Sequence, residues 1–522
     1  MTMFALLNAI TTPRVKPWAA SAVVFLLSAC TVGPDYHRPG LDVGIAYKQA
    51  ASSAQGGLAG GQGTGPESAA NKGWVPAQPS DQVLRGDWWR LFNDPVLSSL
   101  MDTLQTSNFS IAQAEAQYRQ AQALLKSTRS GLYPTVGTSA SGTRSGSGSE
   151  DRVSTGSDFV GNERVINQYT LSGDVSWEAD VWGKVRRGIE SSRAGLEASA
   201  ADVANTRLSM QSTLAQTYFR LRVMDAEQRL LQQTVEAYER SLATTMNRYA
   251  AGVAAQADVA VSRTQLENTR TQLLALDWQR AQLEHAIAVL TGRPPSAFAL
   301  NTSQVLGTVP VIPVGLPSQL LERRPDVAAA ERRTAEANAQ IGVAQAAWFP
   351  DLTLSAQAGF RSGQWAQWLV APASFWSLGP ALALTIFDGG ARQAQLDQAR
   401  AGYDAQVAAY RQTVLTALRE VEDYLVQLHA LGQEQITQGR ALASARESLR
   451  LTQNQYDAGL IDYLSVVQVE TTALSTERAA LQLTADRLVA SVQLIAALGG
   501  GWEAAQTLAA GAPQDDSVGR VQ

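Results

Sequence analysis

The sequence carries one pattern twice, and this internal repeat limits the fold more than any other feature of the chain. The stretch YAAG at residues 249–252 returns as YDAG at residues 456–459, which lies 207 residues later. The same offset joins Gly183 to Gly390 and Gly292 to Gly499. Self-similarity at a fixed offset marks repeated structural units. Each half of the chain is therefore expected to adopt the same fold.

The repeat also extends upstream, where the offset becomes 216. The segment 108–134 (NFSIAQAEAQYRQAQ…LYP) corresponds to the segment 324–350 (RPDVAAAERRTAEAN…WFP). The difference of nine residues between the two offsets falls in the stretch after each proline, Pro134 or Pro350. Gene duplication followed by a small insertion explains this arrangement.

Each copy contains segments in which apolar and polar residues alternate with a period of two, as in a half-buried strand. In YTLSGDVSWEAD (169–180), one face is formed by Tyr169, Leu171, Val175, Trp177 and Ala179. The segments DLTLSAQAGFR (351–361) and FWSLGPALALTIF (375–387) alternate in the same way. A stretch from about Thr135 to Arg144 is rich in glycine and serine, and its place in the repeat predicts a strand more strongly than its own pattern does.

After the strands, apolar residues recur at steps of three and four or of seven, which predicts long helices packed as left-handed coiled coils. The expected seam of the first copy comprises Met210, Leu214, Thr217, Leu221, Met224, Leu231, Val235, Tyr238, Leu242 and Tyr249. Roughly 65 residues of helix would be on the order of 100 Å long. Gly252 and Gly459 suit left-handed helix caps, so each copy is predicted to form an antiparallel helical hairpin that reverses there.

The N-terminus predicts an export signal over residues 1–29. Arg14 and Lys16 precede the short apolar run WAASAVVFLL, and the small residues Ser28 and Ala29 come directly before Cys30. A membrane-spanning helix needs ~20 apolar residues, and no later segment approaches that length. Cys30 is the only cysteine, which excludes an internal disulfide framework.

Composition excludes several classes of function. The net charge of −5, without any basic block, argues against a nucleic-acid partner. The three histidines, His37, His285 and His429, have no metal-ligand spacing. No nucleophile–base pair or phosphate-binding motif has a usable spacing either. We therefore expect no enzyme, no cofactor and no metal.

The predicted strands carry a modest apolar face flanked by aromatic residues, which are Tyr133, Trp182, Trp348, Phe349, Trp365, Trp368, Phe375 and Trp376. This arrangement is typical of a transmembrane barrel with aromatic girdles. Four strands cannot close a barrel alone, because an open edge in lipid leaves backbone groups unpaired. Either several chains share one barrel, or the chain is an extended coiled-coil surface protein; the residue pattern leaves both open.

Four stretches carry a resemblance to a known family. They are LLSAC with the following TVGPDYHRP, WWRLFNDPVLSSLMDTLQTSNFSI (88–111), GLPSQLLERRPDVAAAERRTAEANAQIGVAQAAWFPDLTLS (315–355), and IFDGG (386–390). With the paired Y-x-A-G turns, they make the chain similar to TolC-type outer-membrane efflux lipoproteins of the OprM and NodT kind, from Cys30 to about Trp502.

The resemblance implies a mixed α and β fold in a homotrimer. Four strands per protomer would form a twelve-stranded outer-membrane β-barrel, which continues into a long periplasmic α-helical barrel with an equatorial domain. Such a protein would be a passive exit duct for drugs or other small toxic compounds. Its implied partners are a periplasmic adaptor (membrane fusion protein), an inner-membrane pump of the resistance-nodulation-division type and outer-membrane lipid. A type I protein-secretion duct, or a lipid-anchored coiled-coil adhesin, is the alternative function.

The resemblance also implies roles for individual residues. Cys30 matches the lipid-modified cysteine of a lipobox, and a multiply acylated N-terminus suits an anchor because one acyl chain binds only marginally. Leu464 falls where relatives have a constricting leucine of the periplasmic gate. Gln468 falls where relatives often have an aspartate that helps to form an anionic ring at the gate. This difference argues against such a ring here, although Asp462 lies nearby in the sequence. The turns expected to face the adaptor contain Gly252, Val253, Arg263 and Gly459.

These observations predict six segments: a signal peptide (1–29), a lipidated N-terminal segment and linker (30–92), a first repeat (93–292), an inter-repeat equatorial linker (293–318), a second repeat (319–502) and a disordered tail (503–522). Within the linker, residues 50–73 form a low-complexity insertion. The sequence does not identify the exported compounds or the pump.

Overall fold

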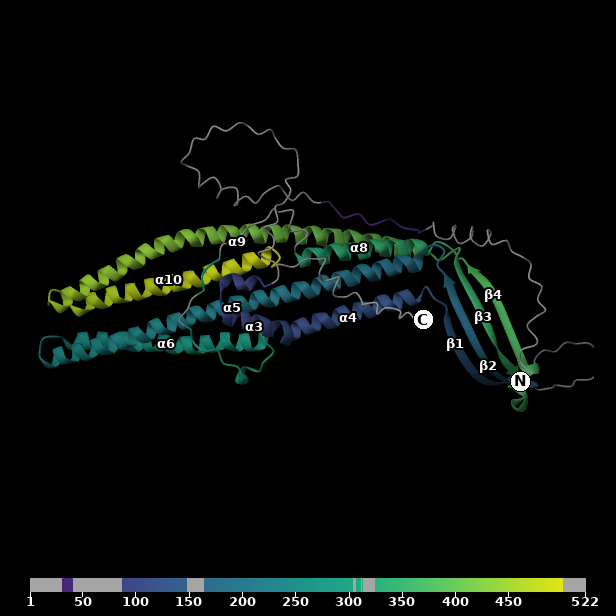
Figure 1. The fold of residues 1–522 in the computed structure, drawn as a ribbon, viewed down its shortest axis with the longest axis horizontal. Coiled ribbons are helices and arrows are strands. Elements are labelled where there is room, and N and C mark those ends of the chain that lie inside the picture. The colour runs from purple at the N-terminus through teal and green to yellow at the C-terminus, as the bar shows by residue number, and fades with distance from the viewer. Residues whose placement is uncertain are drawn as a thin grey trace, which may run out of the picture. The chain divides into compact units, whose positions relative to one another are not determined.

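The computed structural model describes residues 31–40, 87–147, 164–303, 307–310, 312 and 324–500, and Figure 1 shows its ribbon. The chain forms two compact units. The first comprises Met1–Pro39, Gln120–Leu196 and Arg332–Val407; the second comprises Gly40–Arg119, Glu197–Glu331 and Ala408–Gln522. Cys30, the insertion 50–73 and the tail 503–522 lie outside the described residues.

The helices occur as matching pairs. Helices α4 (Phe109–Ser130) and α8 (Pro325–Ala346) each have 22 residues. Helices α5 (Lys184–Ala250) and α9 (Ala391–Asp457) each have 67, and α6 (Gln256–Leu290) and α10 (Tyr463–Ala497) each have 35. The last two pairs begin and end at the offset of 207, and the first pair at the offset of 216. The internal repeat is confirmed.

In the second unit, α5 and α6 form one antiparallel hairpin, and α9 and α10 form the other (Figure 1). Gly252 has a φ of 76° and Gly459 a φ of 75°. The N–H of Val253 donates to the carbonyl of Arg248 at 2.9 Å, and Leu460 repeats this bond in the second hairpin. These are left-handed caps of the Schellman type, as the sequence predicted.

The predicted seam of α5 is largely buried. Leu214, Leu221, Leu231 and Tyr238 are each at most 4% exposed. Tyr249 was also assigned to the seam, and this assignment was wrong, because its side chain is 46% exposed. It lies in the last turn before the hairpin reverses, where the neighbouring helix no longer covers it.

Two short N-terminal elements complete the core of the second unit. The 3-10 helix η2 (Trp88–Phe92) and helix α3 (Pro95–Ser107) bury Trp88, Trp89, Phe92, Leu97, Met101 and Leu104 against α5, α6 and α10. Asp94 caps α3, since its carboxylate accepts bonds from the N–H groups of Val96 and Leu97. The aromatic residues Trp88, Trp89 and Phe92 come from η2, which precedes the first repeat, and they pack in one core with residues of both hairpins.

The first unit contains one antiparallel sheet with the strand order β1-β2-β3-β4. Its strands are β1 (Thr135–Ser147), β2 (Arg164–Ala179), β3 (Asp351–Ser362) and β4 (Ser374–Ala383). Leu171 pairs with Phe360, Val175 with Ala356 and Trp177 with Leu354. Directly paired residues share a face, so the predicted apolar residues of different strands form one continuous face. On the other face, Ser172 lies beside Ser139 and Gln357.

Three strand boundaries differ from the sequence prediction by more than one residue. Strand β2 begins at Arg164, five residues before the predicted start at Tyr169. Strand β1 is longer than expected, since its glycine- and serine-rich residues pair with β2 as far as Ser147. Strand β4 ends at Ala383 instead of continuing to Phe387. Ala383 pairs with Asp351, the first residue of β3, so the residues after it have no partner strand. Ile386 and Phe387 are accordingly about 90% and 88% exposed.

The junctions between strands and long helices also repeat. Asp180 accepts bonds from the N–H groups of Val185 and Arg186 at the start of α5. Asp388 accepts bonds from Gly390 and Arg392 at the start of α9. Each carboxylate satisfies N–H groups that a helix start leaves unpaired. The direction in which each long helix leaves its strand is thereby set by one aspartate.

Candidate functional site

The described residues contain no cluster of metal-ligating side chains. None of them forms a group of three or more histidine, cysteine, aspartate or glutamate side chains able to hold a metal ion. Among the helices in this part of the chain, none combines the length and the apolar content that crossing a membrane requires. The candidate functional surfaces are the ends of the hairpins, which carry the predicted gate and adaptor-facing residues, and the contacts between the two hairpins.

The end of the second hairpin carries the three predicted gate residues. Leu464 and Gln468 are exposed, Leu464 by 58%, and they lie four residues apart on one face of α10. Asp462 has a local role as the N-cap of α10, where its Oδ1 accepts bonds from the N–H and hydroxyl of Ser465. These bonds, led by the one from the hydroxyl, lower the pKa of Asp462, so its negative charge persists at the hairpin end.

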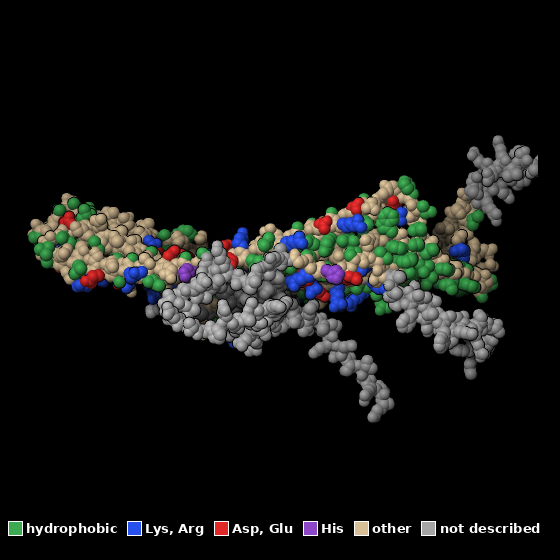
Figure 2. Space-filling view, turned by 90° about the horizontal axis from the view of Figure 1, so that it is seen from above, with side chains coloured by type: hydrophobic (Ala, Val, Ile, Leu, Met, Phe, Trp, Pro, Cys, Tyr) green, Lys and Arg blue, Asp and Glu red, His purple; other side chains and the backbone are tan. Residues whose placement is uncertain are grey.

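The exposed face of α10 stays uncharged well beyond the gate residues. Between residues 464 and 482, its exposed positions are Leu464, Gln468, Thr471, Thr472, Ser475, Ala479 and Gln482. Figure 2 shows the hairpin ends as a surface of mainly uncharged side chains with scattered charges. A solute beside this face would meet hydroxyl, amide and aliphatic groups instead of fixed charge.

The end of the first hairpin places the predicted adaptor-facing residues on the surface. Val253, in the turn, is 67% exposed, and Arg263, on the following helix α6, is exposed as well. Gly252 and Gly459 have no atom within 4 Å of the position that a side chain would take. The positive φ, and not a lack of space for a side chain, therefore requires glycine at both positions. The surface of both turns is accessible to a partner protein.

Contacts between the two hairpins were not predicted from the sequence. The hydroxyl of Tyr463, at the start of α10, lies 2.9 Å from the Ser241 hydroxyl of α5 and 3.3 Å from the Ser262 hydroxyl of α6. Farther along, the Arg478 guanidinium contacts the Glu227 carboxylate and the Gln272 amide. Each bond joins the first repeat to the second, so these bonds resist separation of the hairpins near their ends.

Glu470 of α10 lies between Tyr463 and Arg478 in the sequence, and its side chain is half-buried. Its Oε2 has no hydrogen-bond partner, and burial raises the pKa of its carboxyl group to about 7. Its charge acts on the hydroxyl groups of Tyr238 and Tyr463, whose pKa values it helps to raise. The spacing of residues could have indicated this position. Glu470 follows Val466 by four residues and precedes Ala473 by three, so it lies on the same face of the helix as these buried residues.

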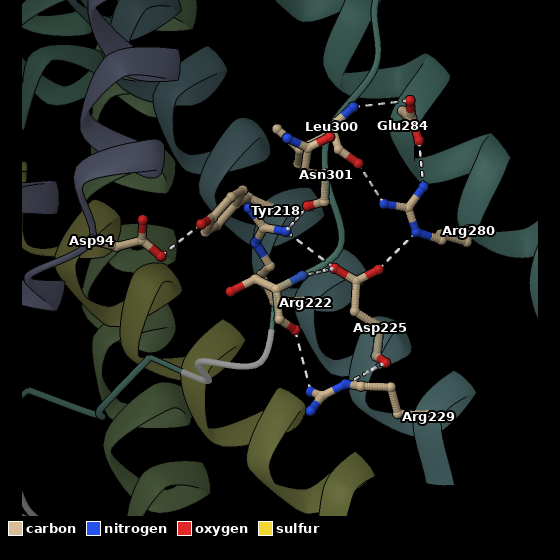
Figure 3. Close-up of polar contacts among 10 residues, drawn as sticks. Asp94, Tyr218, Arg222, Asp225, Arg229, Arg280, Glu284, Leu300 and Asn301 are labelled. Carbon is tan, nitrogen blue, oxygen red and sulfur yellow. Dashed lines mark hydrogen bonds and ion pairs between the residues drawn. The ribbon is translucent and has the colours of Figure 1, made fainter. Parts of the chain in front are cut away.

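A second buried polar cluster fixes the start of the linker between the repeats (Figure 3). The carboxylate of Asp225, on α5, is fully buried and accepts bonds from Arg222 at 3.1 Å and from Arg280 at 2.7 Å. Three arginines donate to backbone carbonyls of the linker: Arg222 to Asn301, Arg280 to Leu300 and Arg229 to Ser303. In return, two backbone N–H groups of the linker donate to carboxylates on the helices, that of Leu300 to Glu284 and that of Ser303 to Asp225. We call these residues the Asp225 cluster.

The Asp225 cluster was also missed by sequence reasoning. Arg222, Asp225 and Arg229 recur at steps of three and four beside the apolar seam of α5. Charges at such positions must be paired when they are buried. The same helix turn carries Tyr218, whose hydroxyl donates to the Asp94 carboxylate at 2.6 Å and so ties the cap of α3 to α5.

Comparison with known proteins places these features in context. The family model described as "Outer membrane efflux protein" matches residues 100–293 and 316–500. The toluene efflux pump outer membrane protein TtgC of Pseudomonas putida is 29% identical over 486 residues, 92% of this chain and 95% of its own length. The pyoverdine export outer membrane protein OpmQ of Pseudomonas aeruginosa is 31% identical over 431 residues, 82% of this chain and 90% of its own length.

A solved structure of the outer-membrane channel OprN resembles the fold. It superposes with a TM-score of 0.78 at 30% sequence identity, covering 91% of this chain and all of the channel's chain. The similarity includes the four antiparallel strands and the long helices of both repeats.

Proposed function

The chain belongs to the family of outer membrane efflux proteins, and from this membership we propose that it is the exit duct of a tripartite efflux system. It is an efflux channel of the bacterial outer membrane and not an enzyme. The observation that carries the proposal is the family match over both repeats, which include every strand and every long helix described above.

The duct is proposed to be a homotrimer. The sheet ends at β1 on one side and at β4 on the other. In lipid, the unpaired N–H and C=O groups of these edge strands would each cost several kcal/mol. Closure with the sheets of two further copies pairs both edges, and the continuous apolar face would then point to lipid. The polar face with Ser172 and Gln357 would line the interior.

The hairpin ends are proposed to have two roles, as a periplasmic gate and as a contact surface for an adaptor. Leu464 and Gln468 would narrow the duct at its periplasmic end, with Asp462 contributing charge beside them. Gly252, Val253, Arg263 and Gly459 would contact a periplasmic adaptor, which connects the duct to an inner-membrane pump of the resistance-nodulation-division type. Support comes from the exposure of Val253 and Leu464 and from the open space around both glycines.

The N-terminus is proposed to be processed and lipidated. Residues 1–29 would be removed and Cys30 would carry the lipid that anchors residues 30–92. The two repeats would then occupy residues 93–292 and 319–502, joined by the equatorial linker 293–318. The Asp225 cluster supports this place for residues 300–303, because it fixes their backbone to α5 and α6.

Cargo selection is proposed to lie outside the duct. One relative is named for toluene and another for pyoverdine, which differ greatly in size and polarity. The uncharged exposed face of α10 supports passive conduction of small toxic compounds of mixed chemistry.

Two measurements test the proposal. The purified full-length protein, inserted into planar bilayers, should conduct ions as a trimer, and a strain lacking it should become more sensitive to several toxic compounds. Complementation with the intact gene should restore resistance. A protein that forms no pore, or a deletion strain unchanged across a broad panel of compounds and secreted proteins, would contradict an efflux role.

A further inference from the structure

The residues that follow Cys30 contact α5, α8 and the junction between β2 and α5. Residues 31–35, Thr-Val-Gly-Pro-Asp, are described with their side chains in the first unit. The N–H of Val32 donates to the Trp182 carbonyl at 3.2 Å, at the junction between β2 and α5. The Trp182 ring in turn stacks on Phe349 with a centroid distance of 4.8 Å, and its indole N–H donates to the Pro350 carbonyl. The segment therefore begins beside a rigid aromatic pair.

Arg187 of α5 holds this segment. Its guanidinium donates to the carbonyls of Val32 at 3.2 Å and Gly33 at 3.1 Å, and to the Asp35 carboxylate at 3.0 Å. The side chain is only 6% exposed. A buried guanidinium needs partners for its donors, and most of those that Arg187 finds here belong to residues 32–35. Glu190, one turn along α5, accepts a further bond.

Two glycines, Gly33 and Gly342, lie where the segment, Arg187 and α8 come close together. Gly33 has a φ of 109°, and a Cβ on it would lie 2.5 Å from the Cα of Gly342 in α8. A Cβ on Gly342 would collide with the Arg187 side chain at 2.9 Å. Asn338, one turn earlier on α8, donates to the Pro34 carbonyl at 3.0 Å. The glycines permit close contact between the segment, Arg187 and α8, which side chains on either residue would prevent.

We propose that these contacts dock residues 31–35, and that Arg187 is the positioning residue that fixes the start of the mature chain at the junction between β2 and α5. The inference rests on the lipidation proposed for Cys30. Cys30 is one peptide bond from Thr31, so a lipid on it would enter the membrane beside the docked segment. The docked segment, and not the lipid itself, then determines the place on the protein at which the lipid enters the membrane.

A spin label in the docked segment tests the proposal. Cys30 is the only cysteine, so the Cys30→Ser chain accepts a single label at Pro34→Cys. In the full-length protein in lipid nanodiscs, we expect one immobilised spectral component. Arg187→Ala should convert it to a predominantly mobile spectrum, Asn338→Ala should do so in part, and Arg187→Lys should restore part of the immobilised component. The matched control is Arg186→Ala, because Arg186 pairs with Asp180 and not with the segment.

The lipidated protein with the same label separates the dock from the anchor. Power saturation should give the same label depth in lipidated and Cys30→Ser protein, and Arg187→Ala should broaden the depth in both. A label that stays immobile in Arg187→Ala, or that is immobile only when lipid is present, overturns the proposal. Mass spectrometry of the N-terminal peptide tests lipidation independently, so an unmodified Cys30 would contradict the anchor while the docking result stands.

Discussion

At the scale of the residue, the Asp225 cluster shows how one buried charge can organise an irregular segment. Residues 300–303 have no periodic pattern and pair with no strand, so their backbone groups need other partners. The cluster supplies them through guanidinium and carboxylate groups held on two helices. When a buried carboxylate accepts bonds from several donors, its removal leaves donors without a partner.

Asp225→Ala is expected to destabilise the protein by about 3–5 kcal/mol. It leaves Arg222 without its buried counter-charge and removes one of the two carboxylates that pair with Arg280, the other being Glu284. Asp225→Asn should cost less, since the amide oxygen can still accept a bond. Asp277→Ala is the control, because Asp277 is exposed and bonds only Gln228 in α5; its effect should stay within about 0.5 kcal/mol. Denaturant unfolding followed by circular dichroism measures all three. Equal midpoints for Asp225→Ala and Asp277→Ala would contradict the assigned role.

Glu470 predicts a pH dependence of the contact between the hairpins. Its folded-state pKa of about 7 lies above the ordinary value of 4.5, so the folded state binds more protons than the unfolded state between these limits. Stability is therefore lost as pH rises from about 4.5 through about 7. Glu470→Gln should stabilise the protein above pH 7 by at most about 3 kcal/mol and have no effect below pH 4.5. Unfolding midpoints across pH 4–8 test this, and a pH-independent effect of Glu470→Gln would contradict it.

At the scale of the element, the glycine caps explain why the two hairpins have equal lengths. Both caps lie at equivalent positions of the repeat and both have positive φ. A residue with a Cβ pays roughly 1–2 kcal/mol for that conformation. Because no atom lies within 4 Å of the position that a Cβ would take on either glycine, this backbone strain is the whole expected effect of adding a methyl group.

Gly459→Ala should therefore destabilise the end of the second hairpin by roughly 1–2 kcal/mol. Gly439→Ala is the matched control, since Gly439 lies inside α9 with equally open surroundings and ordinary helical φ. That substitution should stabilise the helix by roughly 0.5–1 kcal/mol. Hydrogen exchange of peptides from the hairpin end resolves the two effects locally. Effects of the same sign at both positions would refute the explanation.

The elements that the sequence predicted well are those defined by local patterns. Helix repeats, glycine caps and the apolar face of the sheet depend on residue spacing alone, and all three were confirmed. The end of β4 could not be predicted, because it depends on where β3 begins and not on the alternation in 375–387. The Asp225 cluster and the contacts of Arg187 depend on residues far apart in the chain, such as Arg222 with Asn301 and Arg187 with Val32, which no periodicity encodes.

At the scale of the whole molecule, the proposed trimer depends on the contrast between the two faces of the sheet. Leu378 pairs with Ala356 on the apolar face and is 76% exposed in the single chain. Ser377 pairs with Gln357 on the opposite face. These neighbours differ in chain position by one residue and yet should meet different solvents, lipid outside and water inside.

Leu378→Arg should therefore impair insertion and assembly, whereas Ser377→Arg should be tolerated. An arginine facing lipid near the bilayer midplane costs about 2–4 kcal/mol, and every copy in a trimer would carry it. Fractionation of outer membranes, followed by chemical cross-linking, measures the amount inserted and the share that is trimeric. Both should fall in Leu378→Arg and remain near wild type in Ser377→Arg. If the two variants insert equally well, the apolar face does not point to lipid; if Ser377→Arg fails while Leu378→Arg inserts, the faces are reversed.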